Sequence, residues 1–139
     1  MARPDFNELL ELEAIIRDGG SELDTQVACE VAVGLQNFPV HVITLGNPDP
    51  AVPAVGFFGG FHGLERIGTA VVLAYLGSLV RRLRWDSVLH QQLESVRLVF
   101  MPIVNPGGMW RGTRANPNGV DLMRNAPLES RERVPFLFG

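Results

Sequence analysis

The stretch Val52–Gly68, with the sequence VPAVGFFGGFHGLERIG, is the segment around which this chain is organised. Its first part, Ala54–Phe58, is apolar and uncharged, which predicts a strand buried on both faces of a parallel sheet. The double glycine Gly59–Gly60 lets the backbone turn sharply where this strand ends. From Arg66 onward the pattern is helical, so the stretch predicts a strand, a loop and a helix in that order.

His62 and Glu65 fall in this loop, at the carboxyl end of the strand, where open α/β sheets place their ligands. Side chains at this spacing on a first helical turn face the same side and are able to hold one cation together. An imidazole nitrogen with a carboxylate oxygen suits zinc better than calcium or magnesium. The residues alone leave a second interpretation open, in which Glu65 complements the helix dipole and His62 is an ordinary loop residue.

The composition is that of a globular domain. The chain has 139 residues, of which 46% are hydrophobic and 19% charged, and we expect one domain over residues 1–139. With 12 basic and 15 acidic residues the net charge is −3, which argues against general binding to nucleic acid or membranes. Cys29 is the only cysteine, so an internal disulfide is excluded. No signal core or membrane-spanning run is found, which favours a cytoplasmic protein.

The other elements follow from periodicity. Asp5, with Glu8 completing a capping box, predicts a first helix that ends at Gly19–Gly20. Alternation over Thr25–Val33 predicts a half-buried strand, which forms an antiparallel hairpin with a second strand over Phe38–Leu45. Further on we expect helices over Arg66–Arg84 and Asp86–Glu94 and a strand over Val96–Val104. The inward-facing candidates of the long helix are Ile67, Ala70, Val71, Ala74 and Leu83.

A second segment, Asn105–Asn125, reads NPGGMWRGTRANPNGVDLMRN and is predicted to be a loop at the end of a buried strand. It carries donors suited to carboxylates, namely Arg111, Arg114 and Arg124. Asp121 is an acceptor able to orient an imidazole. The alternative is a surface loop with solvated arginines. Of the other histidines, His41 is interpreted as structural and His90 as solvent-facing.

The two segments together resemble the zinc carboxypeptidases of the carboxypeptidase A type, the M14 peptidases. The resemblance implies an α/β fold, a three-layer mixed sheet with helices on both faces, of which this chain supplies the amino-terminal half as a truncated catalytic domain. It also implies one zinc ion, with His62 and Glu65 as its first two ligands. Asp121 matches the acid that orients the first histidine ligand.

The same resemblance assigns the arginines. Arg111 matches the residue that polarises the scissile carbonyl, and Arg124 the residue that binds the terminal carboxylate of the substrate, with Arg114 a second substrate-binding candidate. Met123 stands where the family usually has asparagine, which weakens recognition of a free C-terminus. A third zinc ligand, a histidine, and the catalytic glutamate would lie beyond Gly139, so this chain alone is expected to be inactive.

Three functions remain open at this stage. The first is a zinc metallopeptidase that hydrolyses C-terminal peptide bonds. The second is a zinc deacylase of N-acyl amino acids, similar to aspartoacylase and succinylglutamate desuccinylase. The third is a non-catalytic, truncated copy. In proteins of this family the strand matching Ala54–Phe58 lies inside a wide sheet, so we also expect self-association through residues 54–58 or through the terminal PFLFG segment.

Overall fold

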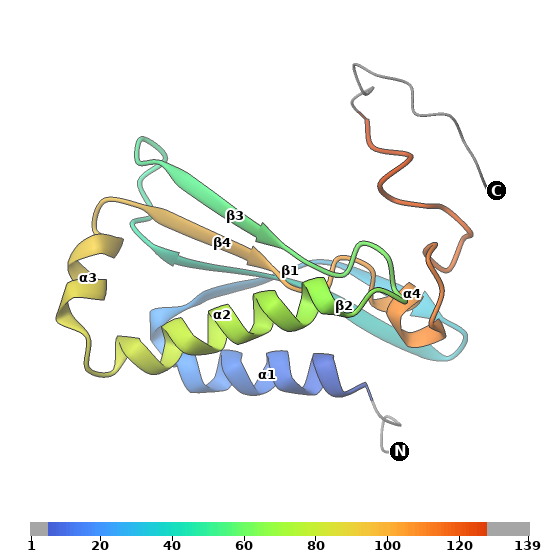
Figure 1. Cartoon of the computed structure of the whole chain (residues 1–139), viewed down its shortest axis with the longest axis horizontal. Coiled ribbons are helices and arrows are strands. Elements are labelled where there is room, and N and C mark those ends of the chain that lie inside the picture. Colours follow the sequence, from blue (N-terminus) through green and yellow to red (C-terminus); the bar gives the residue numbers. More distant parts are fainter. Residues whose placement is uncertain (1–5, 128–139) are drawn as a thin grey trace.

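The computed structural model describes residues 6–127 and shows a mixed α/β fold, as predicted (Figure 1). Its sheet has four strands in the order β1-β2-β4-β3. The strands are β1 (Asp24–Val33), β2 (Gln36–Gly46), β3 (Ala54–Phe58) and β4 (Arg97–Met101). The helices are α1 (Asn7–Gly19), the short 3-10 helix η1 (Gly20–Glu22), α2 (Ile67–Leu83), α3 (Ser87–Leu93) and α4 (Pro106–Arg111).

The hairpin and the parallel pair agree with the sequence analysis, whereas the pairing of β2 with β4 was not predicted. β1 and β2 form an antiparallel hairpin, β2 pairs antiparallel with β4, and β3 runs parallel to β4. Helices α2 and α3 both lie in the connection between the two parallel strands. Because β3 and β4 point the same way, the loop after β3 and the segment after β4 both leave the sheet at the carboxyl ends of these strands and lie on the same side of the molecule.

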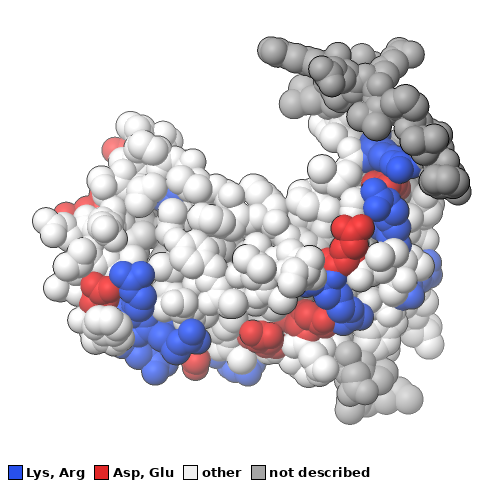
Figure 2. Space-filling model, in the orientation of Figure 1, with Lys and Arg blue, Asp and Glu red and all other residues white. Residues whose placement is uncertain are grey.

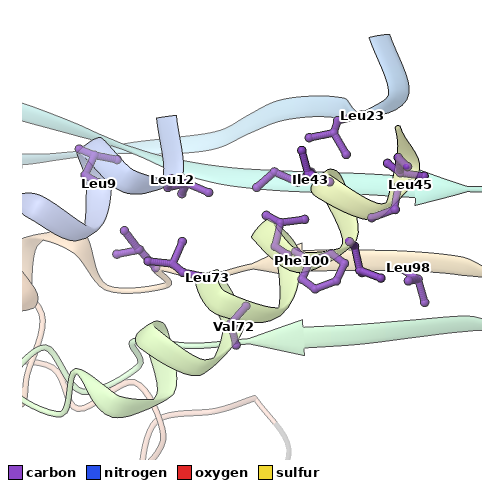
Figure 3. Close-up of a cluster of buried hydrophobic side chains, with 14 of the residues drawn as sticks. Leu9, Leu12, Leu23, Ile43, Leu45, Val72, Leu73, Leu98 and Phe100 are labelled. Atoms are coloured by element: carbon purple, nitrogen blue, oxygen red, sulfur yellow. The ribbon is translucent and has the colours of Figure 1, made fainter. Parts of the chain in front are cut away.

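The core lies between the sheet and helices α1 and α2, which pack against each other (Figure 3). Leu9 and Leu12 of α1 and Leu73 of α2 point toward Ile43 and Phe100 of the two central strands. These side chains are almost completely buried, which fixes both helices on the sheet. Among residues 6–127 no helix is both long and apolar enough to cross a membrane.

Strand β3 has the predicted bounds, but the prediction that it is buried on both faces is wrong. It pairs only with β4 and forms one edge of the sheet. Four of its five residues are exposed, including Val55 and Phe58, and only Phe57 is half-buried. The strand is apolar although no described residue covers its outer edge.

The predicted inward face of α2 is also wrong, apart from Leu83. Ile67, Ala70, Val71 and Ala74 are exposed. The residues that face the core are Thr69, Val72, Leu73, Leu76, Gly77, Leu79, Val80 and Leu83. The helix is apolar nearly all round, so its periodicity does not distinguish the face on the sheet from the opposite one.

Strand β1 departs from simple alternation. A register shift between Val27 and Cys29 marks a β-bulge, and both side chains are exposed. The strand is therefore more exposed than the half-buried strand that the sequence predicts. The other differences concern the ends of elements: β4 is shorter than the predicted Val96–Val104, and the predicted cap Asp5 lies outside the described residues.

Candidate metal centre

The loop after β3 is held against the segment after β4 by its backbone. The N–H groups of Val104 and Asn105 donate to the carbonyls of Gly59 and Gly60, each over 2.9 Å. Gly63 packs directly on α4, where a Cβ atom would lie 1.9 Å from the carbonyl carbon of Gly108. Only glycine fits at position 63 with this spacing, so the loop after β3 packs directly against α4.

Asn105 is the residue of this unit that the sequence analysis missed. Its side chain is 2% exposed, and its Oδ1 accepts from the Gly108 N–H over 2.8 Å, which caps α4. Its Nδ2 donates to the Phe61 carbonyl over 3.1 Å and so ties the loop to the helix. An Asn-Pro pair directly after an apolar strand is the signal of a capped helix start, and it predicts α4 where we had expected a loop.

His62 and Glu65 are brought together as predicted. His62 Nδ1 lies 3.1 Å from Glu65 Oε2, and the imidazole is mostly buried while the carboxylate is half exposed. Two ligands about 2.0–2.1 Å from a tetrahedral zinc are about 3.3 Å apart, which is close to this separation. The pair therefore fits two neighbouring positions in the coordination shell of one zinc ion.

The second ring nitrogen of His62 faces Asp121. The Nε2 atom is buried, makes no hydrogen bond, and lies 3.4 Å from Asp121 Oδ1. A carboxylate on this side favours the tautomer with the proton on Nε2, which leaves the Nδ1 lone pair toward Glu65. The donor set therefore fits a zinc-binding histidine oriented by a carboxylate, and the role predicted for Asp121 remains a prediction.

Arg114 joins the two carboxylates. Its Nε donates to Asp121 Oδ2 over 2.8 Å, and its Nη1 lies 3.3 Å from Glu65 Oε1. The hydrogen bond from Arg114, with a weaker one from the backbone N–H of Arg124, lowers the pKa of Asp121 to about 2. Asp121 is ionised at neutral pH, as the role predicted for it requires.

The other two arginines, Arg111 and Arg124, make contacts within the second segment. Arg124 Nε is 3.5 Å from Asp121 Oδ2, and its side chain is half exposed. Arg111 is exposed, and its Nη1 donates to the carbonyl of Pro117 over 3.0 Å. Both lie in the same segment as Asp121, and their predicted roles toward a substrate remain predictions.

A pocket of about 300 Å³ opens beside the histidine. It is lined by Phe58, Ile67 and Met123 together with His62 and Glu65, among others. Met123 thus contributes an apolar wall next to the candidate ligands. No described residue adds a third ligand: the part of the chain within residues 6–127 contains no group of three His, Cys, Asp or Glu side chains able to hold a metal.

The remaining histidines lie elsewhere. His90 is exposed on α3, as predicted, and its Nε2 is 2.7 Å from the carbonyl oxygen of Leu83. His41 lies in β2, with both ring nitrogens buried and without hydrogen bonds. Burial lowers the pKa of His41, while the negative charge of Glu13 acts in the opposite direction.

The chain is similar to known metallocarboxypeptidases. It is 30% identical to carboxypeptidase SOL1 of Arabidopsis thaliana over 100 residues, which are 70% of this chain and 20% of that protein. The structure resembles a metallo-carboxypeptidase from Burkholderia cenocepacia with a TM-score of 0.64 and 23% identity, over 83% of this chain and 30% of the other.

A second solved structure belongs to the alternative class. The chain resembles a succinylglutamate desuccinylase/aspartoacylase from Rhodobacter sphaeroides with a TM-score of 0.53 and 25% identity, over 79% of this chain and 32% of the other. The chain thus spans well under half of each of these proteins. The family model for zinc carboxypeptidases matches residues 25–136, which include both segments that form the candidate site. The chain therefore belongs to the zinc carboxypeptidase family, the M14 peptidases.

Proposed function

We propose that the natural protein containing this chain is a zinc-dependent hydrolase that cleaves C-terminal peptide bonds. The observation that carries the proposal is the position of His62 between two carboxylates, with Nδ1 toward Glu65 and Nε2 toward Asp121. Zinc held by His62 and Glu65 would supply Lewis-acid activation of a water molecule and of the scissile carbonyl.

The protein's own residues would bind and orient the substrate. Arg111 offers a permanently charged donor for the developing oxyanion, and Arg124 offers a planar donor for the terminal carboxylate. Arg114 would hold the Asp121 carboxylate in place through its hydrogen bond, and Asp121 would in turn keep the imidazole of His62 in the tautomer that binds metal. Full activity would need a third ligand and a general base in addition to these residues.

A deacylase of N-acyl amino acids is the second candidate. Its support is the similarity to the Rhodobacter sphaeroides enzyme and the apolar Met123 in the pocket beside His62. Methionine offers no hydrogen-bond donor to the terminal carboxylate of a peptide. The two functions separate when the natural protein is assayed on peptides with free and with amidated C-termini, beside N-acyl amino acids. Cleavage restricted to the free peptides supports the peptidase, and cleavage restricted to the N-acyl amino acids supports the deacylase.

Zinc binding by the 139-residue chain is expected to be weak, because two protein ligands are fewer than the three of catalytic zinc sites. Zinc titration followed by isothermal calorimetry should show low affinity that His62→Ala abolishes and His90→Ala leaves unchanged. Stoichiometric zinc retained after a chelator wash would contradict this expectation. Loss of binding in the His90 variant would show that zinc sits elsewhere.

Peptidase turnover by the 139-residue chain is expected to be absent, because a missing general base alone lowers the rate by about 10²-fold or more. In the natural protein, His62→Ala should abolish activity together with bound zinc. Carboxypeptidase activity of the 139-residue chain that disappears in Arg111→Ala would refute the expectation, since the described residues would then suffice.

A further inference from the structure

Arg66, the residue directly after Glu65, forms hydrogen bonds with two other helices. Its Nη1 donates to Glu8 Oε1 of α1, and its Nη2 donates to the carbonyl of Met109 in α4 over 3.1 Å. Its own carbonyl accepts from the Ala70 N–H over 3.0 Å, at the start of α2. One guanidinium therefore ties the start of α2, and with it the backbone of Glu65, to both α1 and α4 (Figure 1).

Glu8 is the acidic partner in this contact. Its side chain is 17% exposed, and its Oε2 is buried and has no hydrogen bond within residues 6–127. A carboxylate in such a position is costly unless a cation pairs with it, and the structure pairs it with Arg66. Loss of Arg66 would leave a mostly buried charge without this partner, so the pair is more constrained than an ion pair on the open surface.

The Met109 carbonyl is the second acceptor and lies near the C-terminal end of α4. Carbonyls at this end of a helix lack partners within the helix and carry partial negative charge, so a guanidinium is favoured there. Gly63 packs on the same helix at Gly108. Glu65 therefore lies between two residues, Gly63 and Arg66, that are both anchored to α4.

The carboxylate of Glu65 is itself less firmly held. It is half exposed, and its contacts are His62 and the half-exposed Arg114. In Figure 2 acidic and basic side chains lie next to one another on this side of the molecule, over the start of α2 and the segment after β4. The direction of the carboxylate therefore depends on the backbone that carries it. A ligand whose backbone is fixed before the metal arrives loses less conformational entropy on binding.

We propose that Arg66 is a positioning residue of the zinc site, which fixes the backbone of Glu65 for metal binding by bridging Glu8 and the Met109 carbonyl. This role rests on the proposed function, in which Glu65 is a zinc ligand. Arg66 acts through the peptide bond that joins it to Glu65. Arginine suits the bridge because its two Nη groups reach two acceptors at once, whereas the ammonium of lysine is a point charge.

The first test follows amide hydrogen exchange by NMR in the zinc-free natural protein. The Glu65 N–H donates to the His62 carbonyl over 3.1 Å, so its exchange rate reports how often this turn opens. Arg66→Ala should raise the rate by about tenfold or more, because two hydrogen bonds that hold the turn are lost. Arg82→Ala is the matched control and should leave the rate unchanged. Its side chain is 41% exposed, against 49% for Arg66, and it pairs with the mostly buried Asp86 at the other end of α2.

The second test measures the dissociation constant for zinc in the natural protein, by competition with a chromophoric chelator. Arg66→Ala should raise this constant by about tenfold, as loss of a group that supports a metal ligand does, and Arg82→Ala should leave it unchanged. Arg66→Lys covers the case in which the alanine variant does not fold. It keeps a positive charge for Glu8 but not the bridge, so it should raise the constant by a smaller factor.

Wild-type zinc affinity in Arg66→Ala would overturn the role of Arg66, as would wild-type affinity in Arg66→Lys or an unchanged exchange rate of the Glu65 N–H. These results would leave the proposed function intact as long as His62→Ala still abolishes zinc binding. A natural protein that binds no zinc, or that still binds it after His62→Ala, would instead refute the proposed function and the role of Arg66 with it.

Discussion

Replacing Asn105 by alanine should remove the link between the loop of His62 and helix α4. The side chain makes two hydrogen bonds that alanine cannot make: Oδ1 accepts from the Gly108 N–H, and Nδ2 donates to the Phe61 carbonyl. The first bond caps a helix of only six residues, for which the cap is a large share of its stability. The second crosses between segments that are far apart in the sequence.

The size of the effect follows from these two bonds. Loss of a helix N-cap costs about 1 kcal/mol, and an unsatisfied, partly buried carbonyl costs about 1–2 kcal/mol. We therefore expect Asn105→Ala to lower the free energy of unfolding by about 2–3 kcal/mol. Asn105→Ser should lower it by only about 1–2 kcal/mol, because serine caps a helix nearly as well but does not reach the Phe61 carbonyl.

Urea unfolding followed by circular dichroism measures both variants, at one protein concentration so that association does not distort the comparison. Asn37→Ala, at an exposed position of β2, is the control and should stay within about 0.5 kcal/mol of the wild type. Two results would refute the reasoning. One is an Asn105→Ala variant as stable as the control, and the other is a serine variant destabilised as much as the alanine variant.

Two further predictions use the same unfolding assay. Gly63→Ala should destabilise the chain by about 2 kcal/mol or more, because the added Cβ would overlap Gly108. Gly68→Ala is the control and should be neutral or stabilising, because no other atom lies closer than 4.0 Å to the added Cβ. Equal stabilities of the two variants would contradict the close approach of Gly63 to Gly108. The pKa of His41 is lowered by burial, so the unfolded chain binds the proton first, and stability should fall as the pH drops below about 6.5. His41→Leu should reduce that pH dependence, and an unchanged pH dependence would show that another group is responsible.

The sequence by itself determined most of the elements and their order, although helix α4 was expected to be a loop. The bounds of β3, the antiparallel hairpin, the parallel strand β4 and the helix between the parallel strands all follow from local periodicity and from the glycines at the turns. The pairing of His62 with Glu65 was predicted as well, although the two residues lie in a turn of the loop before α2 and not on its first helical turn: the Glu65 N–H donates to the His62 carbonyl over 3.1 Å, which brings the two side chains together.

Burial was decided only by the tertiary structure. An apolar pentapeptide such as Ala54–Phe58 forms a strand both inside a sheet and at the edge of one. Which of the two positions it takes depends on the strands that pack beside it. The same holds for α2, whose apolar surface extends round the helix, so that packing against α1 and the sheet selects Leu73 and leaves Val71 exposed.

The candidate site also combines contacts that the local sequence predicts with contacts that only the tertiary structure decides. Asp121 reaches His62, and Arg114 bridges Asp121 and Glu65, only because β3 and β4 are parallel neighbours. Their carboxyl ends lie side by side, so the segments that follow them meet there. Local sequence fixes contacts over a few residues through backbone geometry. Contacts between segments so far apart in the chain depend on how the strands are ordered in the sheet, which only the packing of the whole chain determines.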